Sequence, residues 1–403
     1  MSLEIIAISY LLPFLGDDRP QLSPEERQRR DRRNPRIAIQ RYALSPFKYL
    51  YASGNDQALL NCCACDHQVF RQLLHVFAPV FYSHTWDEKW GRIRPVTFAR
   101  DGTPKGRHRQ IDAIGCLGLV LYWYRTRGSV ARSACMAFGL TSTPVYKWLK
   151  FSRRILLFVL QKNPLAVVRP PTEAEVGKYS ASIAAKYPIL QGSNSVWAAM
   201  DGLKTPLQQP SDWFVQNRYY NGWGQSTYIN SVFVFAPDGL IRMCVVNAPG
   251  CFHDSSIAEF GIYDKLERVF EETGAKVVVD SAFALKRHPF LIKSSQTDPE
   301  GVQGVLLNRA ATSVRQLSEH GMRMIQGQFP RLKDRMTYEE FGEREVILSL
   351  MVLLYNFTTS TVGHNMILNS KGSILMEPFQ RQLTISFWKR RNNLSGTKCD
   401  SEV

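Results

Sequence analysis

Three carboxylates of this sequence stand where metal-dependent chemistry on phosphates would need them. Asp201 ends the apolar run Trp197–Met200, and Asp280 ends the apolar run Val277–Val279. Glu319 follows in a segment with helical periodicity. One aspartate after a strand is an ordinary turn residue, but two of them with a later glutamate predict a shared site. Hard carboxylate oxygens hold Mg²⁺ or Mn²⁺, and two such ions flanking a phosphate suit nucleotidyl transfer.

A fourth carboxylate, Asp254, competes for the second place in this set. It follows the third predicted strand, whereas Asp280 follows the fourth. Because the first and fourth strands are expected to be neighbours, the strand argument favours Asp280. We therefore expect Asp254 to support the metal ligands from behind or to cap a helix that starts at Ser255. Whether it contributes to metal binding stays open.

The elements that must position these carboxylates form the second half of the chain. Apolar runs and turn residues predict strands at 196–200, 228–236, 240–247 and 276–279, with helices at 255–270, 311–330 and 343–357. Three antiparallel strands, a helix and a parallel fourth strand are the order of an RNase H-like mixed α/β sheet. We expect this domain to span residues 190–367, after a boundary at 164–188 that contains several prolines.

The first half of the sequence is predicted to contain an all-α, helix-turn-helix-like region at 46–163. Helices are expected at 66–81, 111–124, 129–138 and 144–157, and a basic linker at 91–108. The last helix carries Lys147, Lys150, Arg153 and Arg154, which are candidates for contacts with DNA phosphates. A plain two-helix corner without DNA contact is the alternative. Residues 1–45 are expected to be a basic flexible lead, and 368–403 a basic tail.

The excess of basic over acidic residues indicates which class of partner the protein binds. The chain of 403 residues has a formal net charge of +15, which favours nucleic acid over a membrane surface. The apolar run at 5–15 is too short to span a bilayer, so no membrane partner is expected. Arginines between 27 and 36 fit a nuclear import signal, a phosphate-contacting arm or a solvated charge run. The cysteine usage favours a reducing compartment, and zinc at Cys62, Cys63 and Cys65 is disfavoured because no second pair follows.

Four motifs resemble those of the DDE-superfamily endonucleases of Harbinger-type transposases, in a fungal or oomycete-like subgroup. They are Met200–Gly202, Ala248–Ser255, Val279–Phe283 and Arg315–Arg323, the last continuing to Gln328–Leu332. The resemblance spans about Ser45 to Ile367. It implies that Asp201, Asp280 and Glu319 are the catalytic triad and hold two divalent ions. The implied reaction is cleavage of transposon ends by water, then attack of the 3′-hydroxyl on target DNA.

The resemblance also implies partners and a location. Such elements usually encode a separate Myb-like protein that reads DNA, so we expect one here, together with a nuclear location and an oligomer during transposition. The sequence departs from the family at Phe283, His320, Thr358 and Thr359. A domesticated, catalytically silent DNA-binding protein is the main alternative, and a nuclease that acts on RNA or repair intermediates is another.

Overall fold

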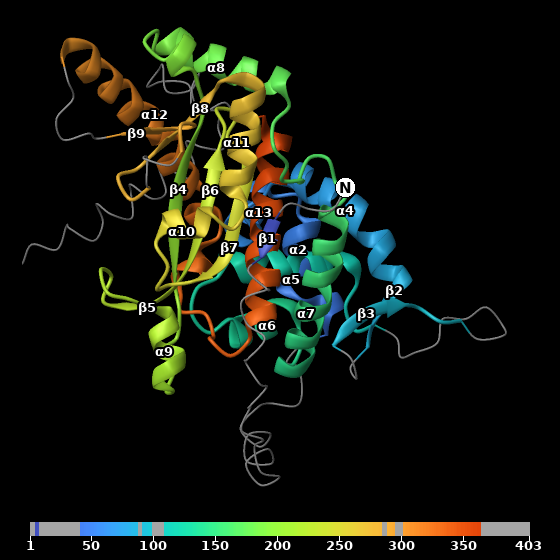
Figure 1. The fold of residues 1–403 in the computed structure, drawn as a ribbon. Coiled ribbons are helices and arrows are strands. Elements are labelled where there is room, and N and C mark those ends of the chain that lie inside the picture. The colour runs from blue at the N-terminus through green and yellow to red at the C-terminus, as the bar shows by residue number, and fades with distance from the viewer. Residues whose placement is uncertain are drawn as a thin grey trace, which may run out of the picture.

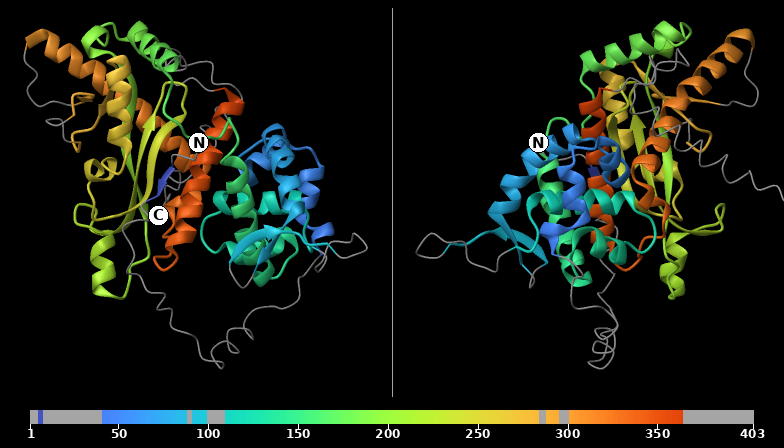
Figure 2. Two further views of the ribbon diagram at one scale, coloured as in Figure 1. Left: turned by 45° about the vertical axis from the view of Figure 1, so that its right-hand side comes forward. Right: turned by 180° about the vertical axis from the view of Figure 1, so that it is seen from behind.

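A mixed sheet with helices on both faces forms one half of the protein, and a group of helices forms the other (Figure 1). The computed structural model describes residues 5–7, 41–87, 91–98, 109–283, 288–294 and 301–363. The expected α/β class with a helical first half is therefore observed. Figure 2 shows from two further sides that α13 (Phe341–Val362) lies between the sheet and the helical half.

Side-chain caps fix where the helices of the first half begin. Asn55, Asp66 and Asp112 each accept a hydrogen bond from the backbone N–H three residues along the chain. The elements are η2 Tyr42–Leu44, α2 Pro46–Ala52, α3 Asp56–Cys63, α4 His67–Ser83, α5 Ala113–Arg125, α6 Val130–Phe138 and α7 Ser142–Leu160.

The predicted linker at 91–108 needs a correction. Its first part contains β3 (Arg92–Pro95), which pairs antiparallel with β2 (His84–Asp87). The basic composition of this stretch hid the strand, because β3 is mostly exposed and lacks an apolar pattern. Residues 99–108 lie outside the described residues.

The main sheet has the strand order β1-β7-β6-β4-β8-β9, with β5 paired to β6. Strands β4, β6 and β7 are antiparallel neighbours, whereas β8 runs parallel to β4 and β9 runs parallel to β8. The predicted order of three antiparallel strands, helix and parallel fourth strand is thus the observed order. The bounds are β4 Val196–Pro206, β5 Tyr220–Asn221, β6 Ser226–Phe235, β7 Ile241–Pro249, β8 Lys276–Val279 and β9 Leu291–Lys293.

Strand β4 is longer than predicted. The sequence suggested an end at Met200, but pairing with β6 continues to Pro206. Beyond Asp201 the side chains alternate, with Leu203 and Thr205 buried and Lys204 partly exposed. An unbroken apolar run was the wrong signal for this half of the strand, because only one of its faces is covered.

Helices cover the two faces of the sheet separately. Helices α10 (Asp254–Ala258) and α11 (Ile262–Thr273) pack on one face, with Ile257 and Leu266 in its core. Helices α12 (Gly301–Gln328) and α13 pack on the other. The single helix predicted at 255–270 is wrong, since the chain breaks at Gly261, whose φ of 102° a helix cannot accommodate. The predicted helix at 311–330 begins earlier, and η4 (Pro330–Lys333) follows it.

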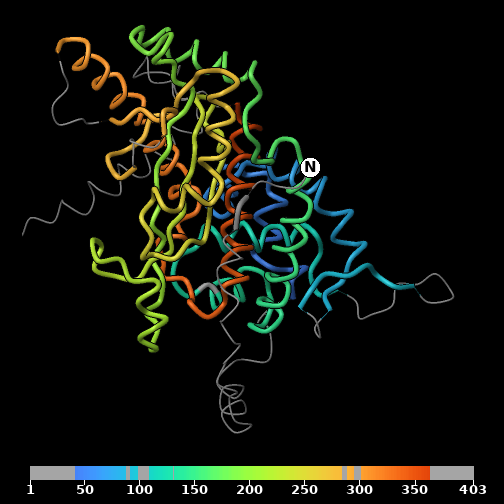
Figure 3. The backbone as a smooth tube through the Cα atoms, viewed as in Figure 1, coloured from blue at the N-terminus to red at the C-terminus, as the bar shows by residue number. Residues whose placement is uncertain are grey.

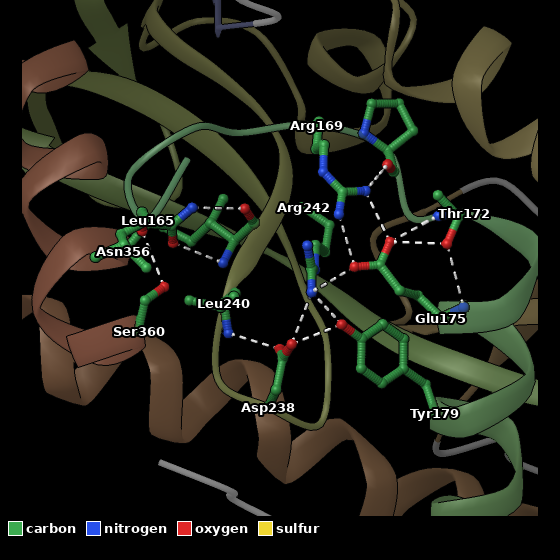
Figure 4. A network of polar contacts seen from close by, with 12 residues as sticks. Leu165, Arg169, Thr172, Glu175, Tyr179, Asp238, Leu240, Arg242, Asn356 and Ser360 are labelled. Carbon is green, nitrogen blue, oxygen red and sulfur yellow. Dashed lines mark hydrogen bonds and ion pairs between the residues drawn. The ribbon is translucent and has the colours of Figure 1, made fainter. Parts of the chain in front are cut away.

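The predicted irregular boundary at 164–188 is also wrong, because it contains helix α8 (Glu173–Lys186). Its prolines flank the helix, and a capping box between Thr172 and Glu175 starts it. Figure 4 shows how the helix is attached to the sheet. Arg242 of β7 contacts Asp238 at 2.7 Å and Glu175 at 3.6 Å, while Tyr179 donates to Asp238 at 2.6 Å.

Helix α13 joins the two halves of the molecule. By length and composition alone it could cross a membrane, but 72% of its most apolar window is buried inside the structure. Asn356 completes the attachment, since its side chain pairs with both backbone groups of Ile241 in β7. The tube in Figure 3 shows this last helix, in red, returning between the earlier elements. The apolar face predicted at 343–357 is therefore a core contact.

The two ends of the chain were predicted to be basic and flexible. Within the lead, Ile5–Ala7 forms strand β1, parallel to Cys244–Val246 of β7, so this part is a strand. Both the arginine cluster between 27 and 36 and the tail at 368–403 lie outside the described residues.

Candidate active site

Asp201 and Asp280 are placed side by side by the parallel register of β4 and β8. Met200 is paired with Val279, and each aspartate is the next residue of its strand. Successive side chains of a strand point to opposite faces, so both carboxylates follow the face of Ala199 and Val278. That face is covered by α12, whose Leu317 packs in the same core cluster.

Asp201 has the electrostatics of a carboxyl group in a crowded acidic site. The Gly202 N–H donates to its Oδ1 at 2.8 Å, which fixes the side chain. Burial raises the pKa of Asp201 to about 6, and the charges of Asp280 and Asp254 add to the rise. Arg315 and the Gly202 hydrogen bond act in the opposite direction. The site thus holds more negative charge than the protein neutralises.

Glu319 reaches this cluster from α12 through an arginine. Arg315 contacts Glu319 Oε1 at 2.8 Å and Asp280 Oδ2 at 3.5 Å, so its guanidinium links the helix to the end of β8. Arg323 lies 3.8 Å from the second Glu319 oxygen. About a third of the Glu319 side chain is exposed, and the same is true of Asp280. Arg315 therefore joins Glu319 to Asp280, and its charge also lowers the pKa of Asp201.

Asp254 stands at the same sheet edge but on the other face. A Cβ at Gly202 would lie 2.3 Å from its Oδ2, so the carboxylate occupies the space that a side chain at 202 would need. Residues 201 and 202 point to opposite faces, and Asp254 thus lies behind Asp201. Burial raises the pKa of Asp254, and Lys204 opposes this. Its predicted capping role is wrong, because His253 is the N-cap and Asp254 is already helical.

The carboxylate oxygens of the cluster match the ligand preference of the expected divalent ions. Asp201, Asp280 and Glu319 supply the hard oxygens that Mg²⁺ and Mn²⁺ prefer. In the described part of the chain, however, no three His, Cys, Asp or Glu side chains are already grouped tightly enough to hold an ion. Arg315 takes the place of a cation between Asp280 and Glu319. The three residues fit a divalent ion because their oxygens are of the preferred type and their negative charge exceeds that of the nearby cations. Glu319 would have to leave Arg315 to bind the ion.

A comparison with known families agrees with this geometry. Residues 200–356 match the DDE superfamily endonuclease family. The matched range contains Asp201, Asp254, Asp280 and Glu319, together with every strand from β5 to β9. No curated protein and no solved structure matches the chain. Residues 200–356 are therefore similar to DDE-superfamily endonucleases.

Outside the matched residues, the two arginines of α7 face other helices. Arg153 is 5% exposed and its guanidinium lies 3.7 Å from the centre of the Trp123 ring, and burial lowers its pKa to about 10. Arg154 pairs with Glu343, and Lys150 lies 3.4 Å from Glu340. These pairs attach α7 to the start of α13. Contact with DNA phosphates stays a prediction for Lys147, which is exposed, and for Lys150.

The cysteines that precede α4 lie in or against the hydrophobic core. Cys63 and Cys65 are buried, and burial raises the pKa of both thiols. His67 is occupied by two other groups, with Nδ1 2.7 Å from Asp56 and Nε2 3.1 Å from the Tyr51 carbonyl. Cys63 and Cys65 are part of the hydrophobic core of the helical half.

The sequence reasoning missed two cations of the site, Arg315 and Lys204. Arg315 could have been found, since it lies four residues before Glu319 on a predicted helix and such pairs share a face. Lys204 could not, because it lies in the half of β4 that the apolar pattern did not predict.

Proposed function

We propose that the protein is a metal-dependent DNA endonuclease of the transposase type, which cleaves transposon ends and joins the 3′-hydroxyl to target DNA. The observation that carries this is the pairing of Asp201 and Asp280 by strand register, with Glu319 linked to Asp280 through Arg315. The strand order supports an RNase H-like fold for the domain. The DDE-superfamily match over the same residues supports the reaction class.

The residues of the site divide the work in this proposal. Asp201, Asp280 and Glu319 would hold Mg²⁺ or Mn²⁺, two ions being expected, which when bound activate the attacking hydroxyl and stabilise the leaving 3′ oxygen. The Gly202 N–H holds the Asp201 carboxylate in one orientation. Asp254 supports the Asp201–Gly202 backbone from the opposite face. Arg315 keeps Asp280 and Glu319 in place until Glu319 is needed as a ligand.

The net charge of +15 supports DNA as the substrate, with terminal repeats and target DNA as its two forms. Sequence specificity is proposed to come from a Myb-like partner, since α7 carries no Asn or Gln among its candidate contacts and base contacts are what specify sequence. A nuclear location and assembly into an oligomer on the paired ends complete the proposal, as does membership of the Harbinger-type subgroup.

Cleavage of a DNA duplex that carries the element's own terminal repeats tests the proposal. The full chain should cut it with Mg²⁺ or Mn²⁺ and not with EDTA. Asp201→Asn, Asp280→Asn and Glu319→Gln should each reduce the rate by about 10³-fold or more, as expected when a group stabilising the transition state is lost. Asp264→Asn on the exposed side of α11 is the matched control and should cut normally.

Asp254→Asn separates its supporting role from that of a ligand. If Asp254 only supports the ligands, Asp254→Asn should reduce the cleavage rate by about 10- to 100-fold and leave measurable cleavage. Cleavage by Asp280→Asn together with none by Asp254→Asn would overturn the assignment of the second carboxylate. Metal-independent DNA binding without any cleavage by the parent protein would instead favour the catalytically silent DNA-binding protein.

A further inference from the structure

The segment between β4 and β6 exposes an unusual group of aromatic rings. It contains helix α9 (Trp213–Tyr219) and strand β5, and it extends beyond the end of the sheet (Figures 1 and 2). Trp213 is 65% exposed, Phe214 73% and Trp223 90%. Large aromatic side chains usually bury most of their surface in a folded protein. A cluster of exposed ones indicates a surface that binds something.

The tip that carries Trp223 is held in a defined conformation. Asn221 accepts a hydrogen bond from the Gly224 N–H at 2.9 Å and donates to the Gly250 carbonyl at 2.9 Å. Gln225 has a left-handed φ of 47°, which closes the turn back to β6. Tyr219 anchors the C-terminal end of α9, since its hydroxyl accepts a hydrogen bond from the buried Arg344 at 3.0 Å. The rings are therefore presented by a fixed support.

This support is continuous with the carboxylate cluster. Gly250 lies against the backbone of both Tyr219 and Tyr228, where a Cβ would come within 2.4 Å of their carbonyl oxygens. The Cys251 N–H donates to the Arg218 carbonyl at 3.3 Å. The same loop runs on directly to Asp254, which rests on Gly202 beside Asp201. Lys204 shares the Gly202 face of β4, contacts the Trp223 ring and lowers the pKa of Asp254, so Trp223 lies on the Asp254 side of the strand that carries Asp201.

The charges around the rings suit a polyanion. Lys204 projects from β4, with its ammonium 4.6 Å from the centre of the Trp223 ring and 3.3 Å from Asn221 Oδ1. Arg218 is exposed on α9. Between 204 and 228 the only acidic residue is Asp212, and its side chain is engaged by the Val215 N–H at the start of α9. Aromatic rings among cations are the means by which proteins hold unpaired bases and their phosphates.

We propose that the α9–β5 segment binds an unpaired base of the DNA strand next to the scissile phosphate, with the base stacked on Trp223 and the adjoining phosphate on Lys204. This deepens the proposed function and rests on it for the identity of the substrate. The segment would hold the strand open at the cleavage point. Stacking reads no particular base, so the contact is independent of sequence.

The test uses the full chain carrying Asp280→Asn, so that binding is measured whether or not the protein cleaves. Two duplexes of the same sequence are compared, one fully paired and one with a single unpaired 2-aminopurine. Trp223→Ala should weaken binding of the second by about 5- to 100-fold, as loss of one base–ring stack does, and change the first less than about twofold. Trp223→Phe should restore most of the difference. Tyr49→Ala, at an exposed ring of α2, is the matched control.

A second readout examines the phosphate contact. Lys204→Gln should make the slope of log affinity against log salt shallower by about one, with unchanged thermal unfolding. Equal affinity of the parent and Trp223→Ala for both duplexes would overturn the inference and leave the surface to a protein partner. Selective loss by Trp223→Ala in a parent that never cleaves would keep the base-binding site and remove the proposed nuclease instead.

Discussion

Two clusters of charged side chains lie on the same sheet and differ in how their charges balance. At the turn between β6 and β7, Arg242 and Arg169 face two carboxylates, with Arg169 2.7 Å from Glu175 and Arg242 2.7 Å from Asp238 (Figure 4). At the ends of β4 and β8, four carboxylates gather where Arg315 contacts two of them. The first cluster is balanced and the second is not.

The pKa values show what the difference means. Burial would raise the pKa of Glu175, but the hydrogen bonds from Arg169 and Thr172 and the charge of Arg242 lower it to about 2. In the second cluster burial raises the pKa of Asp201 to about 6, and its acidic neighbours add to this. A balanced cluster attaches one element to another. An acidic excess destabilises the fold and persists where a cation from outside is to be bound.

The largest effect on stability is expected from breaking the balanced cluster. Arg242 is 7% exposed, and Arg242→Met would leave the Asp238 carboxylate beside Tyr179 without its cation. Removing one partner of a buried pair costs about 3 kcal/mol or more of unfolding free energy, measured by urea denaturation. Arg169→Met, with its side chain 43% exposed, is the control and should cost less than about 1 kcal/mol. Equal costs would contradict the view that burial makes Arg242 the central residue.

Strand ends and their order could be predicted from the sequence, and with them the neighbourhood of Asp201 and Asp280. A short apolar run that ends in a polar residue is a local signal, and the parallel pairing of first and fourth strands follows from the helix between them. Helix α8 was missed for a local reason as well. Its prolines suggested a break, while the capping box at Thr172 and Glu175 went unread.

The inward direction of the α7 arginines was beyond the reach of the sequence. Helical spacing places Arg153 and Arg154 on α7, but their partners Trp123 and Glu343 come from helices far away in the chain. Whether a guanidinium is buried depends on its tertiary partners, and the periodicity of one helix does not predict those partners. The same holds for the contact between Asp254 and Gly202, which arises only when β7 and β4 are both in the sheet.

A second prediction measures the cost of the unbalanced cluster. Asp201 has a folded-state pKa of about 6 against an ordinary value of 3.8, so the folded protein holds this proton more tightly than the unfolded chain does. The stabilising contribution is complete below the ordinary value and is lost as pH rises through about 6. Asp201→Asn carries no such charge. In EDTA it should therefore be more stable than the parent by about 2 kcal/mol at neutral pH.

The pH dependence of that difference is the sharper part of the test. Urea denaturation of parent and variant should show the gap narrowing as pH falls through about 6 and closing below about 3, where Asp201 is protonated in both states. Saturating Mg²⁺ should reverse the order at neutral pH, because ion binding stabilises only the parent. A variant that is less stable than the parent at neutral pH without metal would show that the acidic cluster carries no excess charge.

The smallest effect concerns Arg315, which contacts two carboxylates of the unbalanced cluster. Among the influences on the pKa of Asp201, the charge of Asp280 raises it and the weaker effect of Arg315 lowers it. Arg315→Gln should therefore raise the pKa of Asp201 further, whereas Asp280→Asn should lower it by a larger amount. Carboxyl chemical shifts followed by NMR against pH in EDTA measure both. Arg242→Met should leave this titration unchanged, because the balanced cluster is not among those influences. An unchanged pKa of Asp201 in Arg315→Gln would mean that the guanidinium acts on its direct partners alone, and that the carboxylates are not one electrostatic unit.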